Sequence, residues 1–395
     1  MYYDCIIIGA GAAGLFCGAS FPRRINGLIL EKTNRIGTKL LMSGSGQCNV
    51  THDGSIKDFI PCYGKNGSRI RSCLYQYHNI HLCEFLKRNG IDTFVREDGK
   101  IFPRSMNARE IKDMLYAQSE NNGFHIQKNA AVTAIRKTDR GWRVSTQNKD
   151  YLTGTVILAS GGCSYPSSGS DGSIFEMLKR DLDMEIIPPK PALSPIKVQE
   201  YPYTDLSGIS FPQASVTLME HGRRLASHTG GLLLTHRDFS GPAVMNISKY
   251  GIVGGEIQLN YISRTYEDVL TTLKSALETS RESTENCLAS VFNLPKRFTK
   301  CIVQRAGHSP KALAKALTMD TFIITSIGSF NQAMATAGGI SLAEVNTKTM
   351  EIKKHPGLFA IGEVLDIDGM TGGYNLQFAY SSACVANTHI VNTSL

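Results

Sequence analysis

The sequence predicts an α/β fold in which the two ends of the chain form one nucleotide-binding domain around inserted modules. Three observations lead to this expectation. An apolar, β-branched run at 5–8 precedes a glycine-rich turn, as in a buried parallel strand. A second glycine-rich segment follows a short apolar strand at 357–363. Between them the pattern changes to short alternating strands and then to helices, which is typical of modules inserted into one domain.

The first glycines have the G-x-G-x-x-G spacing of a Rossmann-like dinucleotide-binding turn. Gly9 would permit the tight turn, Gly11 would let the backbone approach a pyrophosphate, and Gly14 would let the next helix pack against the strand. That helix, which includes Ala12 and Ala13, would direct its free N–H groups at the phosphates. The spacing alone is a weak signal, so its strand-and-helix context carries the prediction.

A second apolar strand at 27–30 ends in Glu31 and Lys32. Glu31 lies 17 positions after Gly14, close to where a ribose-binding carboxylate belongs. The alternative is an ordinary charge at a strand end. A carboxylate in this place favours an unphosphorylated ribose, and therefore FAD or NAD over NADP.

Composition sets broad limits. At 395 residues the chain should form two or three domains. The formal net charge of +8 allows nucleic-acid binding without requiring it, and a charged solvated face also explains the basic segment 264–315. No apolar run reaches the length of a membrane span, and no signal-peptide pattern is present, so a cytoplasmic protein is expected. Ten scattered cysteines without a C-x-x-C pair predict free thiols and no metal site.

The proline cluster at 188–195 marks the clearest boundary. We therefore expect a cofactor domain of residues 1–190 and 325–395, a β module of 191–262 and a helical module of 263–324. Within the cofactor domain, the pattern predicts one helix over 69–90, a hairpin over 91–104 and a helix over 107–121. Asp171 should cap the helix that begins at 173, or else bind a cofactor hydroxyl.

Several stretches together resemble the BaiN/YhiN-type bacterial flavoproteins, an aminoacetone-oxidase-like branch of the glutathione-reductase-like FAD superfamily. These stretches are the glycine turn at 9–14, the Gly37 to Asn49 segment with its Ser-Gly-Ser-Gly-Gln-Cys-Asn loop, Ser240 to Ala243, Ala337 to Gly339, and Gly362 to Gln377. The resemblance covers nearly the whole chain. It departs from the family's usual residues at Thr38, Gln47 and His52.

The resemblance implies noncovalent FAD. Glu363 would bind the ribityl chain, and the 373–377 segment would place N–H groups near the flavin pyrimidine ring. Val132 would contact the adenine through its backbone, although a core valine explains it equally well. The full set of expected cofactor-binding residues is Gly9, Gly11, Ala12, Ala13, Gly14, Glu31, Lys32, Lys39, Ser43, Gly44, Gly46, Gln47, Cys48, Asn49, Val132, Ala159, Ser160, Gly161, Gly362, Glu363, Gly373, Tyr374, Asn375, Leu376 and Gln377.

The group that transfers protons is not fixed by the sequence. Candidates are Tyr374, Asn375, Cys48 and His52, with Tyr165 and His236 as further loop residues. No second G-x-G-x-x-G follows a strand, so electrons would pass to O2 or come from transiently docked NAD(P)H. The oligomeric state stays open between monomer and homodimer.

Three functions follow as hypotheses. The first is an oxidase of a small, aminoacetone-like amine that yields a carbonyl product, ammonia and H2O2. The second is an NAD(P)H-linked flavin reductase or dehydrogenase of a larger, steroid-like substrate. The third is a flavin-containing RNA-binding or regulatory protein.

Overall fold

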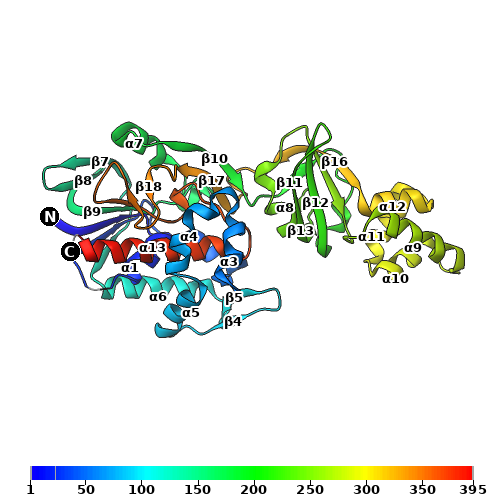
Figure 1. The fold of residues 1–395 in the computed structure, drawn as a ribbon, viewed down its shortest axis with the longest axis horizontal. Helices are drawn as coiled ribbons and strands as arrows, with labels where there is room; N and C mark the ends of the chain where they lie inside the picture. Colours follow the sequence, from blue (N-terminus) through cyan, green and yellow to red (C-terminus); the bar gives the residue numbers. More distant parts are fainter. Residues whose placement is uncertain (1, 23, 394–395) are drawn as a thin grey trace. The chain divides into compact units, whose positions relative to one another are not determined.

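The computed structural model describes residues 2–22 and 24–393, and the chain divides into two compact units. The first unit consists of residues 1–190 and 335–395, and the second of residues 191–334. Both chain ends therefore lie in the first unit, and the β and helical segments between them form the second (Figure 1).

The first unit is built on a mixed sheet with the strand order β18-β19-β20-β9-β1-β2-β6, with β7 and β8 added beside β9. Ile7 of β1 pairs with Ile29 of β2 and Ile157 of β9, and all three are buried because helices and loops cover both faces. The parallel strands are β1 (Tyr2–Ile8), β2 (Gly27–Leu30), β6 (Phe124–Gln127), β9 (Asp150–Leu158) and β20 (Leu358–Ala360). The antiparallel ones are β7 (Val132–Thr138), β8 (Gly141–Thr146), β18 (Val345–Asn346) and β19 (Glu351–Ile352).

Helix α1 (Ala12–Ala19) packs against both α6 (Ala108–Asn121) and α13 (Tyr374–Thr393), so the two chain ends meet at α1 (Figure 1). The Asn387 amide fixes this contact. It accepts a hydrogen bond from Cys17 Sγ at 3.0 Å and donates to the Cys17 carbonyl at 2.8 Å. The remaining elements of the unit are α2 (Thr38–Met42), α3 (Ile56–Phe59), α4 (Arg71–Gln76), α5 (Asn79–Arg88), α7 (Ser173–Leu182), and a small sheet of β3 (Thr51–His52), β4 (Thr93–Val95) and β5 (Lys100–Pro103).

The single helix predicted over 69–90 is wrong, because the chain breaks between α4 and α5. The break frees the Tyr77 carbonyl, which accepts hydrogen bonds from Gln377 Nε2 at 3.1 Å and Ser381 Oγ at 2.5 Å. A tertiary contact with α13 thus overrides a continuous helical pattern.

The second unit contains a closed antiparallel barrel with the strand order β11-β14-β13-β12-β15-β16. Its strands are β11 (Ile196–Val198), β12 (Ser210–Glu220), β13 (Arg223–Leu234), β14 (Phe239–Ser240), β15 (Glu256–Asn260) and β16 (Asp320–Ile327). Its helices are α8 (Pro242–Met245), α9 (Tyr266–Thr279), α10 (Thr284–Phe292), α11 (Lys296–Ala306) and α12 (Pro310–Thr318). Helix α8 is a single short turn that ends at Met245. Strands β10 (Ile186–Ala192) and β17 (Ala335–Ile340) pair where the chain leaves and re-enters the first unit.

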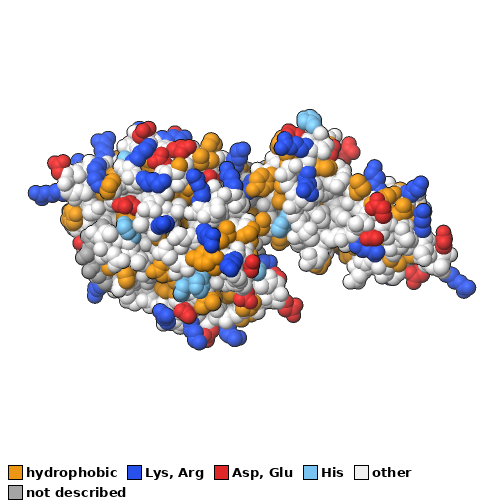
Figure 2. Space-filling model, in the orientation of Figure 1, with side chains coloured by type: hydrophobic (Ala, Val, Ile, Leu, Met, Phe, Trp, Pro, Cys, Tyr) orange, Lys and Arg blue, Asp and Glu red, His pale blue; other side chains and the backbone are white. Residues whose placement is uncertain are grey.

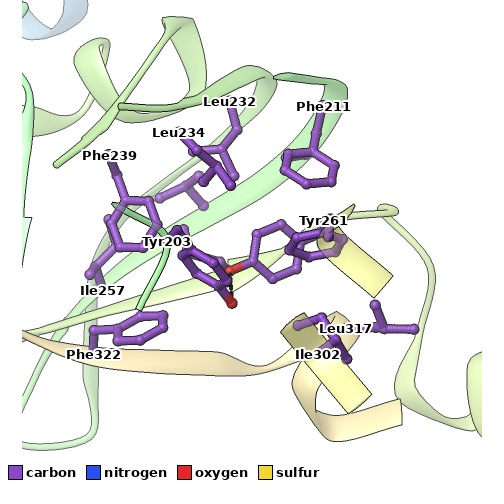
Figure 3. Close-up of a cluster of buried hydrophobic side chains, with 14 of the residues drawn as sticks. Tyr203, Phe211, Leu232, Leu234, Phe239, Ile257, Tyr261, Ile302, Leu317 and Phe322 are labelled. Carbon is purple, nitrogen blue, oxygen red and sulfur yellow. Dashed lines mark hydrogen bonds between the residues drawn. The ribbon is translucent and has the colours of Figure 1, made fainter. Parts of the chain in front are cut away.

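The barrel and the helices of the second unit share one core (Figure 3). Phe298 of α11 lies 4.7 Å, centroid to centroid, from both Phe211 and Tyr261. A buried polar network lies beside these rings, in which Asp320 accepts hydrogen bonds from Tyr203 at 2.5 Å and from Tyr261 at 2.8 Å. Arg305 completes this network, so the helices are fixed to the barrel by both apolar and charged contacts.

Among the described residues, no helix combines the length and apolar character needed to cross a membrane.

Candidate functional site

The turn between β1 and α1 has the geometry that its glycines predict. Gly9 has φ +105° and donates its N–H to the Leu30 carbonyl at 2.8 Å. A Cβ on Gly14 would lie 1.9 Å from the Gly9 carbonyl oxygen, so only glycine allows α1 to approach β1 this closely. A Cβ on Gly11 would meet nothing within 4 Å, which leaves open space at the start of α1. This is where the fingerprint places a pyrophosphate.

Glu31 is buried at the end of β2, and its carboxylate is held in place by backbone groups. Its Oε2 accepts from Ala10 N at 2.9 Å, and its Oε1 accepts from Thr33 N at 2.8 Å. Ala130 N donates to the Glu31 carbonyl at 2.8 Å, which brings the segment that leads to Val132 beside Glu31. The protein residues that were predicted to bind the ribose and the adenine therefore lie together.

Lys32 makes an ion pair with Asp171 at 2.5 Å. Asp171 also accepts a hydrogen bond from Ser173 N at 3.1 Å, at the start of α7. Asp171 therefore contacts the first residue of α7, whose N-cap is Gly172, and both roles expected for it stay predictions.

Lys39 and Glu363 are 324 positions apart in the sequence, yet their side chains form an ion pair at 2.5 Å. Lys39 also donates to Ser170 Oγ at 3.3 Å, and Glu363 accepts from Thr336 N at 2.9 Å. A Cβ on Gly161 would lie 3.9 Å from the Lys39 amine. The structure thus gathers three expected cofactor residues and adds Ser170 and Thr336, which no local pattern singled out.

Ser160 carries an unusual feature. Ala159 and Ser160 come directly after β9. A Cβ added to Gly9 would lie 2.9 Å from the Ser160 Cα, so Ser160 is next to the glycine turn. Its hydroxyl oxygen is buried and has no hydrogen-bond partner within residues 2–22 and 24–393. Buried hydroxyls are nearly always satisfied, so this one suits a polar ligand atom beside the glycine turn.

The Ser/Gly-rich loop and the start of α13 form the second half of the site. Gly44 and Ser45 have left-handed backbones, which bend the loop back so that Cys48 N donates to the Ser43 carbonyl at 3.0 Å. The Asn49 amide, in the orientation that satisfies its neighbours, accepts from Gly373 N at 3.1 Å. Gly46 and Gln47 are half-buried in the same loop.

Thr51 follows this loop and ties it to α13, because its hydroxyl donates to Gln377 Oε1 at 2.7 Å. A Cβ on Gly373 would lie 2.6 Å from the Thr51 Cα, so no larger residue fits between them. Gly362 is equally confined, by Ala13 of α1, while Leu376 is half-buried in the first turn of α13.

Tyr374 is the candidate acid whose surroundings are best defined. Its ring is stacked on His52, with centroids 5.5 Å apart and an interplanar angle of 11°. Tyr63 donates to the Tyr374 carbonyl at 2.8 Å. Burial raises the pKa of the Tyr374 phenol, and a hydrogen bond with Cys62 raises it further, so the phenol stays protonated at neutral pH.

The other candidates have less freedom to react. Burial raises the pKa of the Cys48 thiol to about 11, which leaves it protonated and a poor nucleophile. Both amide atoms of Asn375 are engaged with the backbone of Gly369, at 2.8 and 2.9 Å. Tyr165 has a left-handed backbone at φ +52°, and His236 lies exposed in the second unit.

These features fit FAD. The first half of the site offers an open helix start, a buried carboxylate and the buried Ser160 hydroxyl, which has no partner among the residues that the structure describes. The second half offers the start of α13, which begins at Tyr374 directly after the glycine pair 372–373. An elongated dinucleotide with a polar ring at one end needs both kinds of group.

Comparison with known proteins gives the same assignment. The chain is 30% identical to "Ribosomal RNA dihydrouridine synthase" of Escherichia coli (strain K12), over 96% of each chain. It is 28% identical to "3-dehydro-bile acid delta(4,6)-reductase" of Clostridium scindens, over 96% of this chain and 97% of the relative.

Solved flavoenzymes share the fold. They include a 3-ketosteroid-Δ4-(5α)-dehydrogenase from Rhodococcus jostii RHA1, with a TM-score of 0.51, 14% identity, and coverage of 98% of this chain and 97% of the other. A flavocytochrome c3 fumarate reductase matches with a TM-score of 0.52 and 16% identity, over 98% of this chain and 78% of the other. The model of the HI0933-like protein Rossmann domain matches residues 3–389. The predicted fold class and family are therefore confirmed, and the chain belongs to the HI0933-like family of FAD-dependent oxidoreductases.

Proposed function

We propose that the protein is a reductase that saturates a carbon–carbon double bond conjugated with a carbonyl group, and that its substrate is a uridine of ribosomal RNA. The observation that carries this proposal is the full-length match to a relative named for dihydrouridine synthesis. A second relative of the same name, from Haemophilus influenzae, matches at 29% identity over 97% of each chain. Dihydrouridine differs from uridine by two hydrogens added across the C5=C6 bond, which is conjugated with the C4 carbonyl.

The reaction needs a hydride at one carbon and a proton at the other. FAD, when bound, supplies the redox chemistry, and reduced nicotinamide that docks transiently would restore the electrons. The protein's part is to hold the cofactor and control charge. Glu31 and Ser160 would bind the adenosine and diphosphate half, while the Lys39–Glu363 pair would lie along the ribityl chain.

Tyr374 would hold the proton. Burial raises the pKa of the phenol, so it carries its proton near neutral pH, and the His52 ring stacks against it. The N–H groups at the start of α13 would stabilise negative charge as it develops on the reduced flavin or on the substrate carbonyl.

The test uses ribosomal RNA transcribed in vitro, which contains unmodified uridine. FAD-loaded protein would be incubated anaerobically with this RNA and NADPH or NADH. The RNA would then be digested to nucleosides, which would be separated by chromatography and identified by mass spectrometry. We expect dihydrouridine, detected by the mass of two added hydrogen atoms. A protein whose flavin is reduced under these conditions, but which yields no dihydrouridine, would refute the proposal.

A second candidate is a reductase of steroid-like 4-en-3-ones, which corresponds to the second functional hypothesis. It is favoured by the bile acid reductase, whose name also describes the reduction of double bonds in a 3-oxo compound. Loss of the ultraviolet absorbance of a 3-oxo-4-ene bile acid, with no RNA product, would support it.

The amine oxidase that the family resemblance suggested remains a separate hypothesis. The two kinds of relative reported above are named for reductive chemistry, so we rank it below both reductases. Its test is peroxide formation when the aerobic protein meets aminoacetone, which neither reductase hypothesis predicts.

A further inference from the structure

Two neighbouring helices of the second unit repeat the same sequence pattern at an interval of 15 residues. Each repeat begins with Pro-Lys and continues with an apolar residue, a second lysine and another apolar residue. The matched pairs are Pro295 and Pro310, Lys296 and Lys311, Phe298 and Leu313, Lys300 and Lys315, and Ile302 and Leu317. A three-residue turn with Gly307 joins the two helices, a connection that occurs in helix-turn-helix and αα-hairpin motifs.

The repeat separates apolar from basic side chains. The four apolar positions are fully buried in the core shared with the barrel, whereas all four lysines are exposed. The helical period places each pair of lysines, four residues apart, on the face opposite the buried side chains. We call Lys296, Lys300, Lys311 and Lys315 the lysine face. Figure 2 shows Lys and Arg side chains protruding over α12.

Little within the protein neutralises this charge. Residues 286–319 contain six Lys or Arg and no Asp or Glu. The two arginines are used internally, since Arg297 donates to the Asp205 carbonyl and Arg305 pairs with Asp320. No ion pair reaches the lysine face from any residue that the structure describes.

Glu285 of α10 is an acidic residue that interacts electrostatically with Lys300 of the lysine face. Its pKa is lowered by hydrogen bonds at the start of α10, and to a lesser extent by the charges of His308 and Lys300. A single half-buried carboxylate that is already bound at its own helix start does not neutralise four lysines.

The folding of these helices does not explain the lysines. Like charges four residues apart destabilise a helix, and positive charge in the first turn opposes the helix dipole. Helices α9 and α10 of the same unit follow the favourable rule, with Glu267, Asp268 and Glu285 in their first turns. Helices α11 and α12 instead have no acid there. An external anion would offset this cost.

We propose that the lysine face is a docking surface for the phosphate backbone of RNA. This inference rests on the proposed function, because it names the surface through which an RNA substrate is held. Lysines act as flexible point charges that fix a nucleic acid without reading its sequence. Gln304 and His308, exposed on the same helix and turn, are polar, which suits a hydrated phosphate backbone better than a membrane, where apolar side chains would accompany the lysines.

The test compares three versions of the FAD-loaded full-length protein. In the first, all four lysines of the face are changed to Gln, which keeps the helix propensity and removes the charge. In the second, the same four are changed to Arg, which keeps the charge. The third is a matched control in which four exposed lysines of the first unit are changed to Gln, namely Lys87, Lys149, Lys179 and Lys348.

The measurement is the affinity for a fluorescein-labelled oligouridylate of 20 nucleotides over a series of salt concentrations. Each phosphate contact contributes about 0.7 to the slope of log affinity against log salt for single strands. The four-Gln protein should therefore lose up to about 3 from this slope, whereas the Arg protein and the matched control should keep the wild-type slope. With ribosomal RNA as the substrate, the KM of the four-Gln protein should rise while its kcat stays the same.

The outcomes separate the two proposals. Absence of dihydrouridine with wild-type protein refutes the proposed function. Formation of dihydrouridine, with the four-Gln protein keeping the wild-type slope and KM, refutes the docking surface alone. Equal slope losses in the four-Gln protein and the matched control would show general charge effects and also refute it. Lysine-dependent binding to phosphatidylserine vesicles, without a change in RNA affinity, would assign the face to a membrane instead.

Discussion

Replacing Ser160 by Ala should stabilise the FAD-free protein against unfolding. The same substitution should weaken the binding of FAD. The Ser160 hydroxyl is buried beside the glycine turn and finds no hydrogen-bond partner in the described part of the chain. A buried polar group in that state costs free energy, and alanine removes the group while keeping the Cβ. We expect the same hydroxyl to donate a hydrogen bond to a cofactor oxygen when FAD is bound.

The two effects have opposite signs and measurable sizes. An unsatisfied buried hydroxyl costs about 1–3 kcal/mol, so its removal should stabilise the FAD-free protein by about 1 kcal/mol. For a chain of 395 residues that is a rise in Tm of about 1 °C. A hydrogen bond to a charged phosphate oxygen contributes about 1.5–3 kcal/mol, so the Kd for FAD should increase at least about tenfold.

The assay is thermal unfolding of FAD-free protein together with titration of FAD followed by quenching of its fluorescence. Ser164→Ala is the matched control, because Ser164 is fully buried and its hydroxyl bonds Thr336 Oγ1 at 2.8 Å. That variant should unfold at a lower temperature. If Ser160→Ala also lowers the Tm of the FAD-free protein, or leaves FAD affinity unchanged, the argument from the unsatisfied hydroxyl is wrong.

Four further outcomes follow from the same geometry. Gly14→Ala places a Cβ 1.9 Å from the Gly9 carbonyl oxygen, so it should cost more than about 3 kcal/mol and abolish FAD retention on purification. Glu31→Gln should raise the Kd for FAD about tenfold by calorimetry. Tyr374→Phe should lower the rate of dihydrouridine formation at least about 100-fold, with flavin reduction unchanged. The pKa of Asp98 is lowered by Arg96 and Lys100, so Asp98→Asn should cost under about 1 kcal/mol in urea unfolding at pH 7. This difference should disappear as pH falls below about 4, because the unfolded carboxylate then takes up protons before the folded one.

Local patterns were sufficient to predict the glycine turn between β1 and α1. Gly9, Gly14 and Glu31 act through a strand, a turn and a helix that follow one another in the chain, so their spacing carries the geometry. The confirmed fold class rests on the same kind of signal. A buried, β-branched run that turn residues bound on both sides is typical of a central strand.

Contacts between distant segments could not be predicted in this way. Thr336 bonds Ser164 across 172 positions, and Thr51 bonds Gln377 across 326. A single threonine carries no periodicity, and its partner is fixed only after the sheet has assembled. The helix break at Tyr77 has the same cause, since the carbonyl that it frees is used by α13.

The glycine pair before α13 meets a different structural constraint from the glycines of the β1–α1 turn. Gly9 and Gly14 satisfy a requirement that any Rossmann-type dinucleotide turn imposes, so they cannot distinguish one substrate from another. Gly373 answers to a different constraint, because the Thr51 backbone lies 2.6 Å from where its Cβ would be and its φ is +92°. The same segment, residues 49–52, also supplies Asn49 and His52. The Asn49 amide accepts a hydrogen bond from Gly373, and the His52 ring stacks on Tyr374. A substitution in this loop therefore shifts the N–H groups and the phenol together, so reactivity should change there without loss of the adenosine half of the cofactor site.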